Sequence, residues 1–289
     1  PSRLVGSEMC IRDRSDGDLR ISTTLPYWAT GNGGQRAVTQ PLLADLGQDG
    51  VPDLVLATLD TSDGDDPTVI ALPLASTAPT DPSWSVVLDR GTHPSDPAWG
   101  ALDAGTDVVI LTTLDENSGN MWAWRIDGAT GSLDWDRVAI EGTDADSNAP
   151  RLRLPGPVIA QFDDDASPEV VLTLPSDSNG RTSGNGAQFA IWELTSTTEI
   201  LRFRTPNGFA DAPPVPDDRD GDGIMDRLCW ATWYSTSAVN LNRQGLAGCH
   251  DLDEDEATKA WSQTMEQGSG NSNDEIALAP GTLLDLDGE

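Results

Sequence analysis

The chain has 289 residues, with 48 acidic and 17 basic side chains, so its formal net charge at neutral pH is −31. A charge of this size repels nucleic acid and anionic membranes, and no apolar run reaches the roughly 20 residues of a membrane-spanning helix. We therefore expect neither a nucleic-acid partner nor membrane insertion. The 28 glycines and 20 prolines, without long helical periodicity, are typical of an all-β protein with many turns.

Residues 1–14 differ in character from the rest of the chain. The stretch EMCIRD at 8–13 back-translates to DNA that resembles a transposon end used as a sequencing adapter, so this segment is interpreted as a translated artefact. A genuine basic N-terminus is the alternative. Because the last residues stop in mid-motif, we expect 15–289 to be a window onto a longer protein, in which a secretory signal would not be visible.

An acidic segment followed by an apolar one recurs along the chain. Copies begin near residues 45, 103, 161, 218 and 285, a period of about 60 residues. Hairpin-like stretches that end on a large apolar residue keep the same spacing. Each unit is predicted to form strand, acidic loop, strand, longer loop, strand, turn and strand. The apolar second strands are predicted at 53–59, 107–114, 169–174 and 226–234.

This repeat predicts the fold class. A four-stranded unit that recurs at such an interval is typical of a β-propeller blade, which buries its faces against two neighbouring blades. Residues 15–289 would supply about four to five blades of this length. The predicted fold is therefore an all-β, incomplete β-propeller of four-stranded antiparallel blades. Prolines 213, 214 and 216 favour an edge strand before the third complete acidic loop.

The acidic segments have the spacing of a calcium loop. The clearest copy reads DRDGDGIMD from Asp218, with acids at positions 1, 3, 5 and 9 and the carbonyl of Ile224 at position 7. An EF-hand is rejected because Cys229 stands at position 12, where a bidentate Glu is required. Alternate side chains of a tight turn converge on one point, and oxygen atoms are the ligands that Ca²⁺ prefers. An exposed acidic turn without an ion is the alternative.

The copies keep this pattern to different degrees. The first has Gly47 at position 3, and the second has Ala166 in place of the turn glycine and is expected to bind more weakly. The shortened segment 103–107 is expected to bind nothing, and the clusters 60–66 and 251–259 are interpreted as solvated turns. The predicted Ca²⁺ ligands, through carbonyls at position 7 and side chains elsewhere, are Asp45, Asp49, Val51, Asp53, Gln161, Asp163, Asp165, Ser167, Glu169, Asp218, Asp220, Asp222, Ile224, Asp226, Asp285, Asp287 and Glu289.

The segments 44–59 and 217–233 resemble the FG-GAP (VCBS-type) repeat of the integrin α-subunit propeller, and the resemblance covers residues 15–289. It implies structural calcium ions on one rim of a propeller, with ligands bound by loops elsewhere. The Phe-Gly and Gly-Ala-Pro landmarks of that family are absent. The hairpin at 122–135 also looks like those of quinoprotein propellers, without their cofactor-binding residues.

Two classes of function remain open. One is a calcium-stabilised propeller, extracellular or on the cell surface, that binds a protein or glycan, as in adhesion. The other is the propeller part of a secreted carbohydrate-active enzyme, such as a polysaccharide lyase, or of a quinoprotein-like dehydrogenase, with catalytic residues outside this chain. No nucleophile elbow or phosphate loop occurs in the sequence, and His93 and His250 belong to no catalytic constellation. No catalytic residue is therefore predicted.

The tryptophans fall into two groups. Trp84, Trp135 and Trp261 recur in register with the repeat and are predicted to lie in blade cores. Trp28 and Trp99 lie outside that pattern and are candidates for stacking on a sugar ring.

Two cysteines remain outside the first segment. Cys229 is predicted on the second strand of a unit and Cys249 on the third, which are antiparallel neighbours in a blade. A cross-strand disulfide would suit this arrangement and would indicate an oxidising compartment. Two buried free thiols are the alternative.

Overall fold

The computed structural model describes residues 8–12, 19–24, 36–37, 39–59, 66–74, 82–91, 93–102, 105–114, 120–135, 138–140, 154–174, 186–196, 198–206, 208, 210, 212–235, 243–253 and 256–265. All regular structure among these residues is β-strand, which confirms the predicted all-β class. None of them forms a helix that could span a membrane. Trp28, most of the cluster 60–66, Asp285, Asp287 and Glu289 lie outside the described residues, so the predictions made for them stay predictions.

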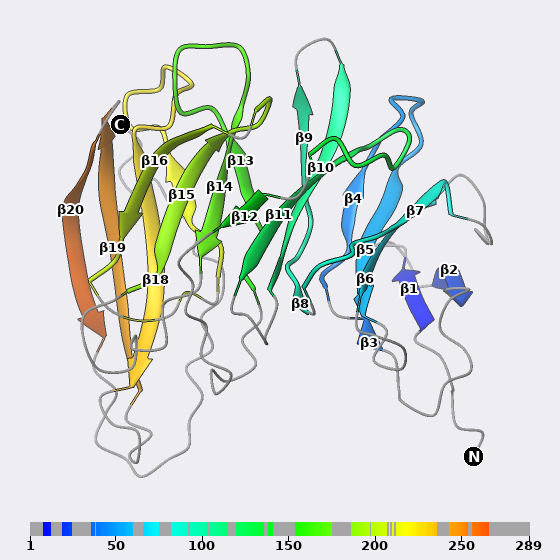
Figure 1. Cartoon of the computed structure of the whole chain (residues 1–289), viewed down its shortest axis with the longest axis horizontal. Coiled ribbons are helices and arrows are strands. Elements are labelled where there is room, and N and C mark those ends of the chain that lie inside the picture. Colours follow the sequence, from blue (N-terminus) through cyan, green and yellow to red (C-terminus); the bar gives the residue numbers. More distant parts are fainter. Residues whose placement is uncertain are drawn as a thin grey trace.

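Antiparallel sheets account for the strands. β1 (Glu8–Arg12) pairs with β2 (Leu19–Thr24), and four larger sheets follow in chain order. Figure 1 shows these four side by side in an arc, and they are called blades one to four. Blade one comprises β3 (Arg36–Ala37), β4 (Leu42–Ala44), β5 (Asp53–Leu59), β6 (Pro67–Pro73) and β7 (Trp84–Val87). Blade two comprises β8 (His93–Pro94), β9 (Ala98–Leu102), β10 (Thr106–Leu114), β11 (Met121–Asp127) and β12 (Val138–Ile140). Blade three comprises β13 (Val158–Ala160), β14 (Glu169–Leu174), β15 (Gln188–Glu193) and β16 (Glu199–Arg204), and blade four comprises β17 (Val215–Asp217), β18 (Arg227–Ser235), β19 (Arg243–Asp253) and β20 (Glu256–Met265).

Each blade is a meander with four strand positions, as the repeat predicts for a β-propeller. In blades one and two the first strand is split into two short pieces that both pair with the second strand. A hydroxyl group fills each gap: Thr39 Oγ1 accepts the Ala57 N–H at 2.9 Å, and Ser95 Oγ accepts the Thr112 N–H at 2.9 Å. His93 lies in β8, one of these short pieces. The proline-rich strand β17 is an edge strand, as predicted.

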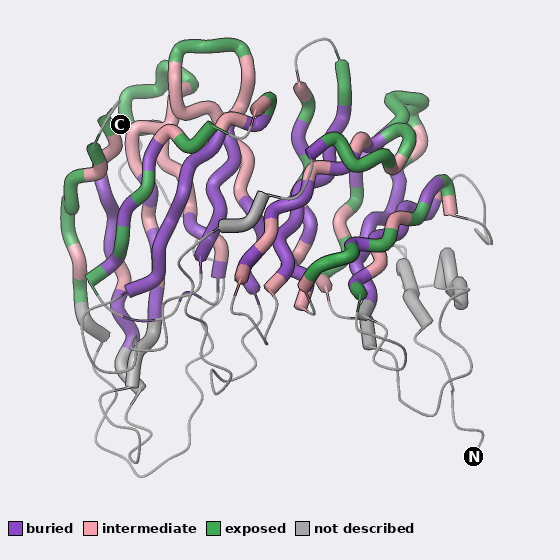
Figure 2. The backbone as a smooth tube through the Cα atoms, in the orientation of Figure 1, coloured by how far each residue is buried: buried purple, intermediate pink, exposed green. Residues whose placement is uncertain are grey.

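The core lies between the blades. Three clusters of buried apolar side chains fill the junctions of blades one and two, two and three, and three and four. The second strands of blades one to three are buried on both faces, as their continuous apolar sequences predict; β14, for example, is buried along its whole length. In β18 buried and half-buried residues alternate from Arg227 to Thr232, so the prediction was wrong for blade four. Figure 2 shows this buried interior beneath exposed loops. Burial of apolar surface contributes about 25 cal/mol per Å² to stability, so each blade is held mainly by its neighbours.

The three tryptophans in register with the repeat do not share one environment. Trp84 and Trp135 are buried, as predicted, and Trp84 Nε1 donates to the Gly128 carbonyl of the next blade at 2.6 Å. Trp261 is 48% exposed, so its assignment to a core was wrong. It lies on β20, the edge strand of blade four, and belongs to none of the core clusters of the described residues. Trp84 and Trp135 pack in core clusters that the following blade helps to form. Among the described residues, no following blade packs against Trp261 in this way.

The two cysteines form the disulfide that the predicted strand order allows. Cys229 on β18 and Cys249 on β19 are register partners, and their sulfur atoms are 1.99 Å apart. The bond links the second and third strands of blade four. His250, next in the chain, is buried and accepts the Trp230 Nε1–H at its Nδ1 at 2.9 Å, so its imidazole is part of the packing of this blade.

Candidate metal centre

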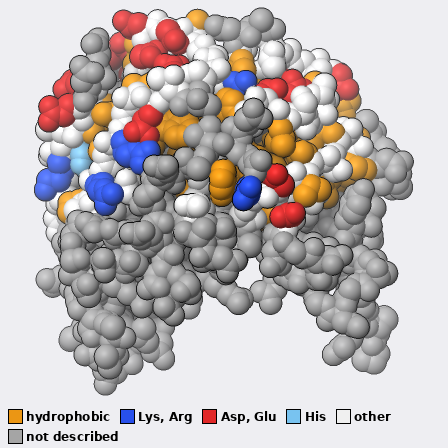
Figure 3. Space-filling view, viewed as in Figure 1, with side chains coloured by type: hydrophobic (Ala, Val, Ile, Leu, Met, Phe, Trp, Pro, Cys, Tyr) orange, Lys and Arg blue, Asp and Glu red, His pale blue; other side chains and the backbone are white. Residues whose placement is uncertain are grey.

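The acidic loops connect the first and second strands of their blades. Loop one (45–53) joins β4 to β5, loop two (161–169) joins β13 to β14, and loop three (218–226) joins β17 to β18. Equivalent connections in blades that stack in the same sense must lie at the same end of the sheets. Figure 1 shows them at the upper rim, and Figure 3 shows acidic side chains gathered there. The sequence repeat thus becomes a row of acidic turns along one rim.

All three loops share one local bend. The carboxylate at position 5 accepts the N–H of the residue at position 7, which fixes the peptide unit before the carbonyl predicted to bind the ion. Short polar side chains often make such bonds to the backbone two residues later. The bonds are Val51 N to Asp49 Oδ1 at 2.8 Å, Ser167 N to Asp165 Oδ1 at 2.7 Å and Ile224 N to Asp222 Oδ1 at 2.8 Å.

Loops one and three close this bend in the same way. The first-position carboxylate accepts the N–H of the sixth residue at 2.9 Å, from Gly50 to Asp45 Oδ2 and from Gly223 to Asp218 Oδ2. Both glycines have positive φ, 82° and 96°, a conformation that other residues adopt only at a cost. The backbone of these two loops therefore requires glycine at the sixth position.

Loop two closes the bend differently. Gln161 stands at the first position, and its Nε2 donates to the carbonyls of Asp163 at 2.8 Å and Asp165 at 2.6 Å. The sixth residue, Ala166, does not take a positive φ. Because the amide nitrogen of Gln161 is engaged in the turn, only its Oε1 remains as the predicted ligand atom.

Loop two gathers three carboxylates. Oxygen atoms of Asp163, Asp165 and Glu169 lie within 4.8 Å of one another. Glu169 is fully buried: its Oε2 accepts the Phe162 N–H, while its Oε1 has no hydrogen-bond partner among the described residues. Burial, with the charge of Asp163 adding to it, raises the pKa of Glu169 to about 7. A buried carboxylate oxygen without a partner costs about 1–3 kcal/mol or more, so this group has the properties of an incomplete coordination site.

Loop three gathers a different set of carboxylates. Oxygen atoms of Asp218, Asp220 and Asp222 lie within 4.8 Å of one another. Asp226, the predicted ninth-position ligand, does not belong to this group, but its Oδ1 is buried and has no hydrogen-bond partner among the described residues. Loops two and three could therefore each hold a metal ion.

Loop one does not form such a group among the described residues. Its third position is Gly47, which offers no ligand atom. Asp53 is mostly buried and satisfied by the protein, since its Oδ2 accepts the Leu46 N–H at 3.2 Å and its Oδ1 accepts the Ser83 hydroxyl at 3.4 Å. Burial raises the pKa of Asp53. The structure thus places Asp45, Asp49 and Asp53 in one turn without bringing three carboxylates together.

Glu193 is a residue that the sequence analysis missed. It lies on β15, directly opposite Glu169 in the strand register. Burial and the charges of Asp165 and Asp163 raise its pKa, so it lies within the electrostatic reach of loop two. Nothing in the repeat marks this position, because a residue of the third strand reaches the loop only through sheet pairing.

Two further acidic segments lie outside the three loops. In the shortened connection of blade two, Asp103 and Ala104 lie outside the described residues, and the Gly105 N–H donates to the Leu102 carbonyl at 3.3 Å, so the prediction that this segment binds nothing stays a prediction. The cluster 251–259 forms a mostly exposed hairpin, but Asp251 is not simply solvated, because it accepts a hydrogen bond from Arg227 Nε at 2.7 Å.

Trp99, a candidate for sugar stacking, is 43% exposed on β9.

Comparison with known proteins leaves the family open. No family model and no curated protein sequence matches the chain. Similar solved structures include a putative exo-β-1,3-galactanase from Bifidobacterium bifidum S17 (13% identity, 78% of this chain and 72% of that chain, TM-score 0.43). The Dos1 propeller (11%, 91% and 58%, 0.43) and an endo-1,4-β-xylanase from Bacteroides thetaiotaomicron (10%, 78% and 76%, 0.40) are also similar. Likenesses this weak carry no conclusion about what the chain does.

Proposed function

We propose that the chain is a calcium-stabilised β-propeller that serves as a binding module, and that loops two and three each bind a Ca²⁺ ion. The observation that carries this proposal is Glu169. A fully buried carboxylate with an unpartnered oxygen, beside Asp163 and Asp165, must either keep a proton or bind a cation to offset its charge and its lost hydration, and at neutral pH or above a cation is favoured.

Repulsion among the carboxylates of loop two, and among those of loop three, favours a bound cation. Two carboxylates about 4.8 Å apart repel by about 3–4 kcal/mol at the effective dielectric constant of 20 that is typical near a protein surface. Each group holds three such side chains within that distance. A divalent ion converts this repulsion into attraction.

The donor set favours Ca²⁺ over other divalent ions. All candidate donors are oxygen atoms, and neither group contains His or Cys, which makes zinc or copper a poor fit. Ca²⁺ accepts six to eight oxygen ligands in flexible geometry, including backbone carbonyls, whereas Mg²⁺ demands a near-ideal octahedron. The carbonyls of Ser167 and Ile224 would complete the sets.

An extracellular or surface location is part of the proposal. The Cys229–Cys249 disulfide supports it, because such bonds persist mainly in oxidising compartments. Calcium sites of extracellular modules have dissociation constants of about 10⁻⁴–10⁻³ M, which suits turns as exposed as loop three. A protein or glycan is the proposed ligand of the module.

Thermal unfolding tests the calcium site. We expect the full chain to unfold at a higher temperature in CaCl₂ than in chelator, since a ligand at 100 times its Kd adds about 2.7 kcal/mol per site. Asp165→Asn and Asp222→Asn should each remove about half of the gain. Asp164→Asn is the matched control, because Asp164 is exposed in loop two and lies outside the group. Equal unfolding temperatures in calcium and chelator would refute the proposal.

Glycan binding tests the ligand half of the proposal. Trp99 is exposed on β9, and its Nε1 donates to Asp107 Oδ1 at 3.2 Å, which holds the indole in place. We expect Trp99→Ala to abolish binding on a glycan array in calcium, whereas Trp261→Ala, at an equally exposed tryptophan of blade four, should not change it. Equal effects of the two substitutions would contradict a sugar platform at Trp99.

A further inference from the structure

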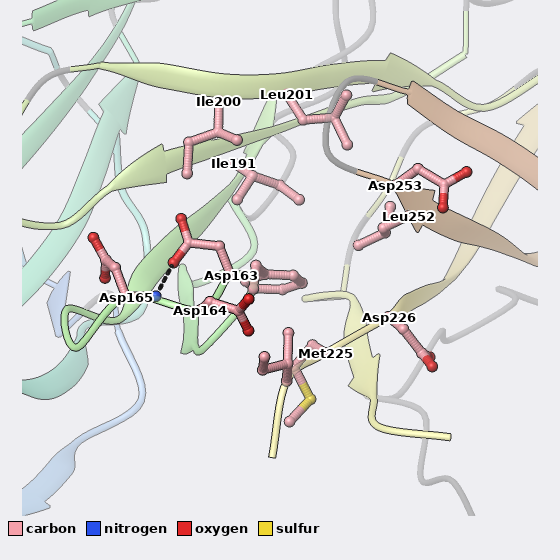
Figure 4. Close-up of a pocket in the computed structure, with 12 residues that line it drawn as sticks. Asp163, Asp164, Asp165, Ile191, Ile200, Leu201, Met225, Asp226, Leu252 and Asp253 are labelled. Atoms are coloured by element: carbon pink, nitrogen blue, oxygen red, sulfur yellow. Dashed lines mark hydrogen bonds between the residues drawn. The ribbon is translucent and has the colours of Figure 1, made fainter. Parts of the chain in front are cut away.

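A cavity of about 690 Å³ lies where blades three and four meet, at the rim that carries loops two and three. Figure 4 shows its lining: apolar side chains of β15 and β16 face Met225 and Leu252 across the space. Sites for small molecules typically have volumes of about 300–1,000 Å³, so the cavity is large enough for one.

The apolar part of the lining is preformed. Ile191 and Leu201 belong to the core cluster shared by the two blades, and Leu252 packs against it. Backbone hydrogen bonds fix the opposite wall, from Met225 N to the Gln161 carbonyl at 2.7 Å and from Leu252 N to the Asp226 carbonyl at 2.8 Å. A ligand would not have to order these groups when it binds, which lowers the cost of association.

The charged part of the lining is entirely acidic. Asp163, Asp164 and Asp165 border the cavity from blade three, and Asp226 and Asp253 border it from blade four. No Lys, Arg or His belongs to the lining among the described residues. The cavity therefore combines apolar walls with an acidic border.

We propose that this cavity binds a small organic cation, an ammonium or guanidinium group carried on an apolar body. An inorganic ion alone would leave the partly exposed walls formed by Ile200, Met225 and Leu252 in water. An anionic ligand would lie beside five aspartate residues. A cation with an apolar body satisfies both, since its body covers the walls and its charge lies among the aspartates. Asp163, Asp165 and Asp226 also belong to the proposed Ca²⁺ sets, so bound calcium would lower the negative charge of the cavity. Asp164 and Asp253 belong to neither set and would keep their charge in calcium.

The test uses 4-phenylbutylammonium as the probe and the full chain as the protein. Methyl resonances of Met225 and the isoleucines are followed by NMR during a titration in chelator. We expect the amine to cause saturable chemical-shift changes at Met225 and Ile200. The control 4-phenylbutyrate has the same apolar body and the opposite charge, and it should bind at least about tenfold more weakly. The neutral 4-phenylbutanol should also bind more weakly. If the dispersed methyl resonances disappear in chelator, the titration is made in calcium.

Charge-neutral variants localise the effect. Asp164→Asn and Asp253→Asn should each lower the affinity about three- to fivefold, as expected for exposed ion pairs. Asp66→Asn, at an exposed position before β6, should leave it unchanged. Equal binding of the alcohol and the amine, no shifts at the cavity, or no effect of either cavity variant would overturn the proposal. Binding of a lysine-containing peptide without binding of the amine would also overturn it, because the occupant would then be a protein.

The experiments distinguish a failure of the calcium proposal from a failure of the organic-cation proposal. A chain without calcium sites would lose the thermal shift and keep the amine titration in chelator. A chain whose cavity binds no organic cation would lose the titration and keep the thermal shift.

Discussion

Loops one and two connect the same strands of different blades, and they gather their carboxylates differently. Loop one keeps aspartate at the first position and glycine at the sixth, as loop three does. Loop two has Gln161 and Ala166 there, yet loop two brings three carboxylates within 4.8 Å and loop one does not. Agreement with the repeat therefore did not predict which turn forms the group.

The difference lies at the third and ninth positions. Loop two has Asp163 at the third position, where loop one has Gly47. At the ninth position, the longer side chain of Glu169 bonds the Phe162 N–H and leaves Oε1 unpartnered, whereas both oxygens of Asp53 are used by the protein. The bend itself can be closed by a glycine or by a glutamine amide. It follows that ligand supply, and not backbone shape, separates the two loops.

Substituting Glu169 should have the largest effect, and its sign should depend on calcium. In chelator above pH 7, Glu169→Gln removes a buried charge and should raise the free energy of unfolding by about 2–3 kcal/mol. In calcium the same substitution removes a ligand and should lower it by a similar amount. Chemical denaturation under both conditions measures the two values, and a change of the same sign in both would contradict the assignment of Glu169 to the ion.

The pH dependence of the unfolding free energy of the unsubstituted chain also tests the burial of the Glu169 charge. The folded-state pKa of Glu169, about 7, lies above its ordinary value of 4.5, so the folded chain keeps a proton that the unfolded chain releases between these pH values. Its contribution to stability in chelator should therefore be greatest below pH 4.5 and should be lost as the pH rises through 7. The difference in unfolding free energy between wild type and Glu169→Gln, measured from pH 5 to 8, should widen with pH. A constant difference would show that Glu169 does not titrate in this range.

Adding an aspartate at the third position of loop one tests whether the missing ligand explains the difference between loops one and two. A Cβ atom added at Gly47 meets nothing within 4 Å, and this glycine does not have positive φ, so Gly47→Asp should fold normally. We expect calcium titration calorimetry to show one additional site. In chelator the new charge should cost about 0.5–1 kcal/mol. Gly47→Asn is the matched neutral control, and an equal gain of binding in that variant would argue against the role of charge.

Exchanging the sixth-position residues should have the smallest effects. Gly223→Ala forces a side chain into a left-handed conformation and should cost about 1–2 kcal/mol in calcium and in chelator. Ala166→Gly should cost only about 0.4–1 kcal/mol, through the greater freedom of the unfolded chain. Both values come from denaturation curves. Equal costs would mean that loops two and three share one backbone conformation after all.

Much of the fold was predictable because it is encoded locally. The period of the apolar strands, the acidic turns between them and the glycines with positive φ depend on residues close in sequence. Strand order made a Cys229–Cys249 disulfide possible, since the second and third strands of a meander must be neighbours, but it left two free thiols as the alternative. Within each loop, the bonds from position 5 to position 7 depend only on turn chemistry.

The sequence by itself determined an all-β chain of repeated meanders with acidic turns on one rim. The tertiary structure alone decided that Trp261 is exposed, that Glu193 lies opposite Glu169, that loop one lacks a gathered group, and that an acidic, apolar-walled cavity lies between blades three and four. The physical reason is one of range. Turn and strand propensities act over a few residues, whereas burial, pKa and cavity shape depend on which surfaces meet when one blade packs against the next.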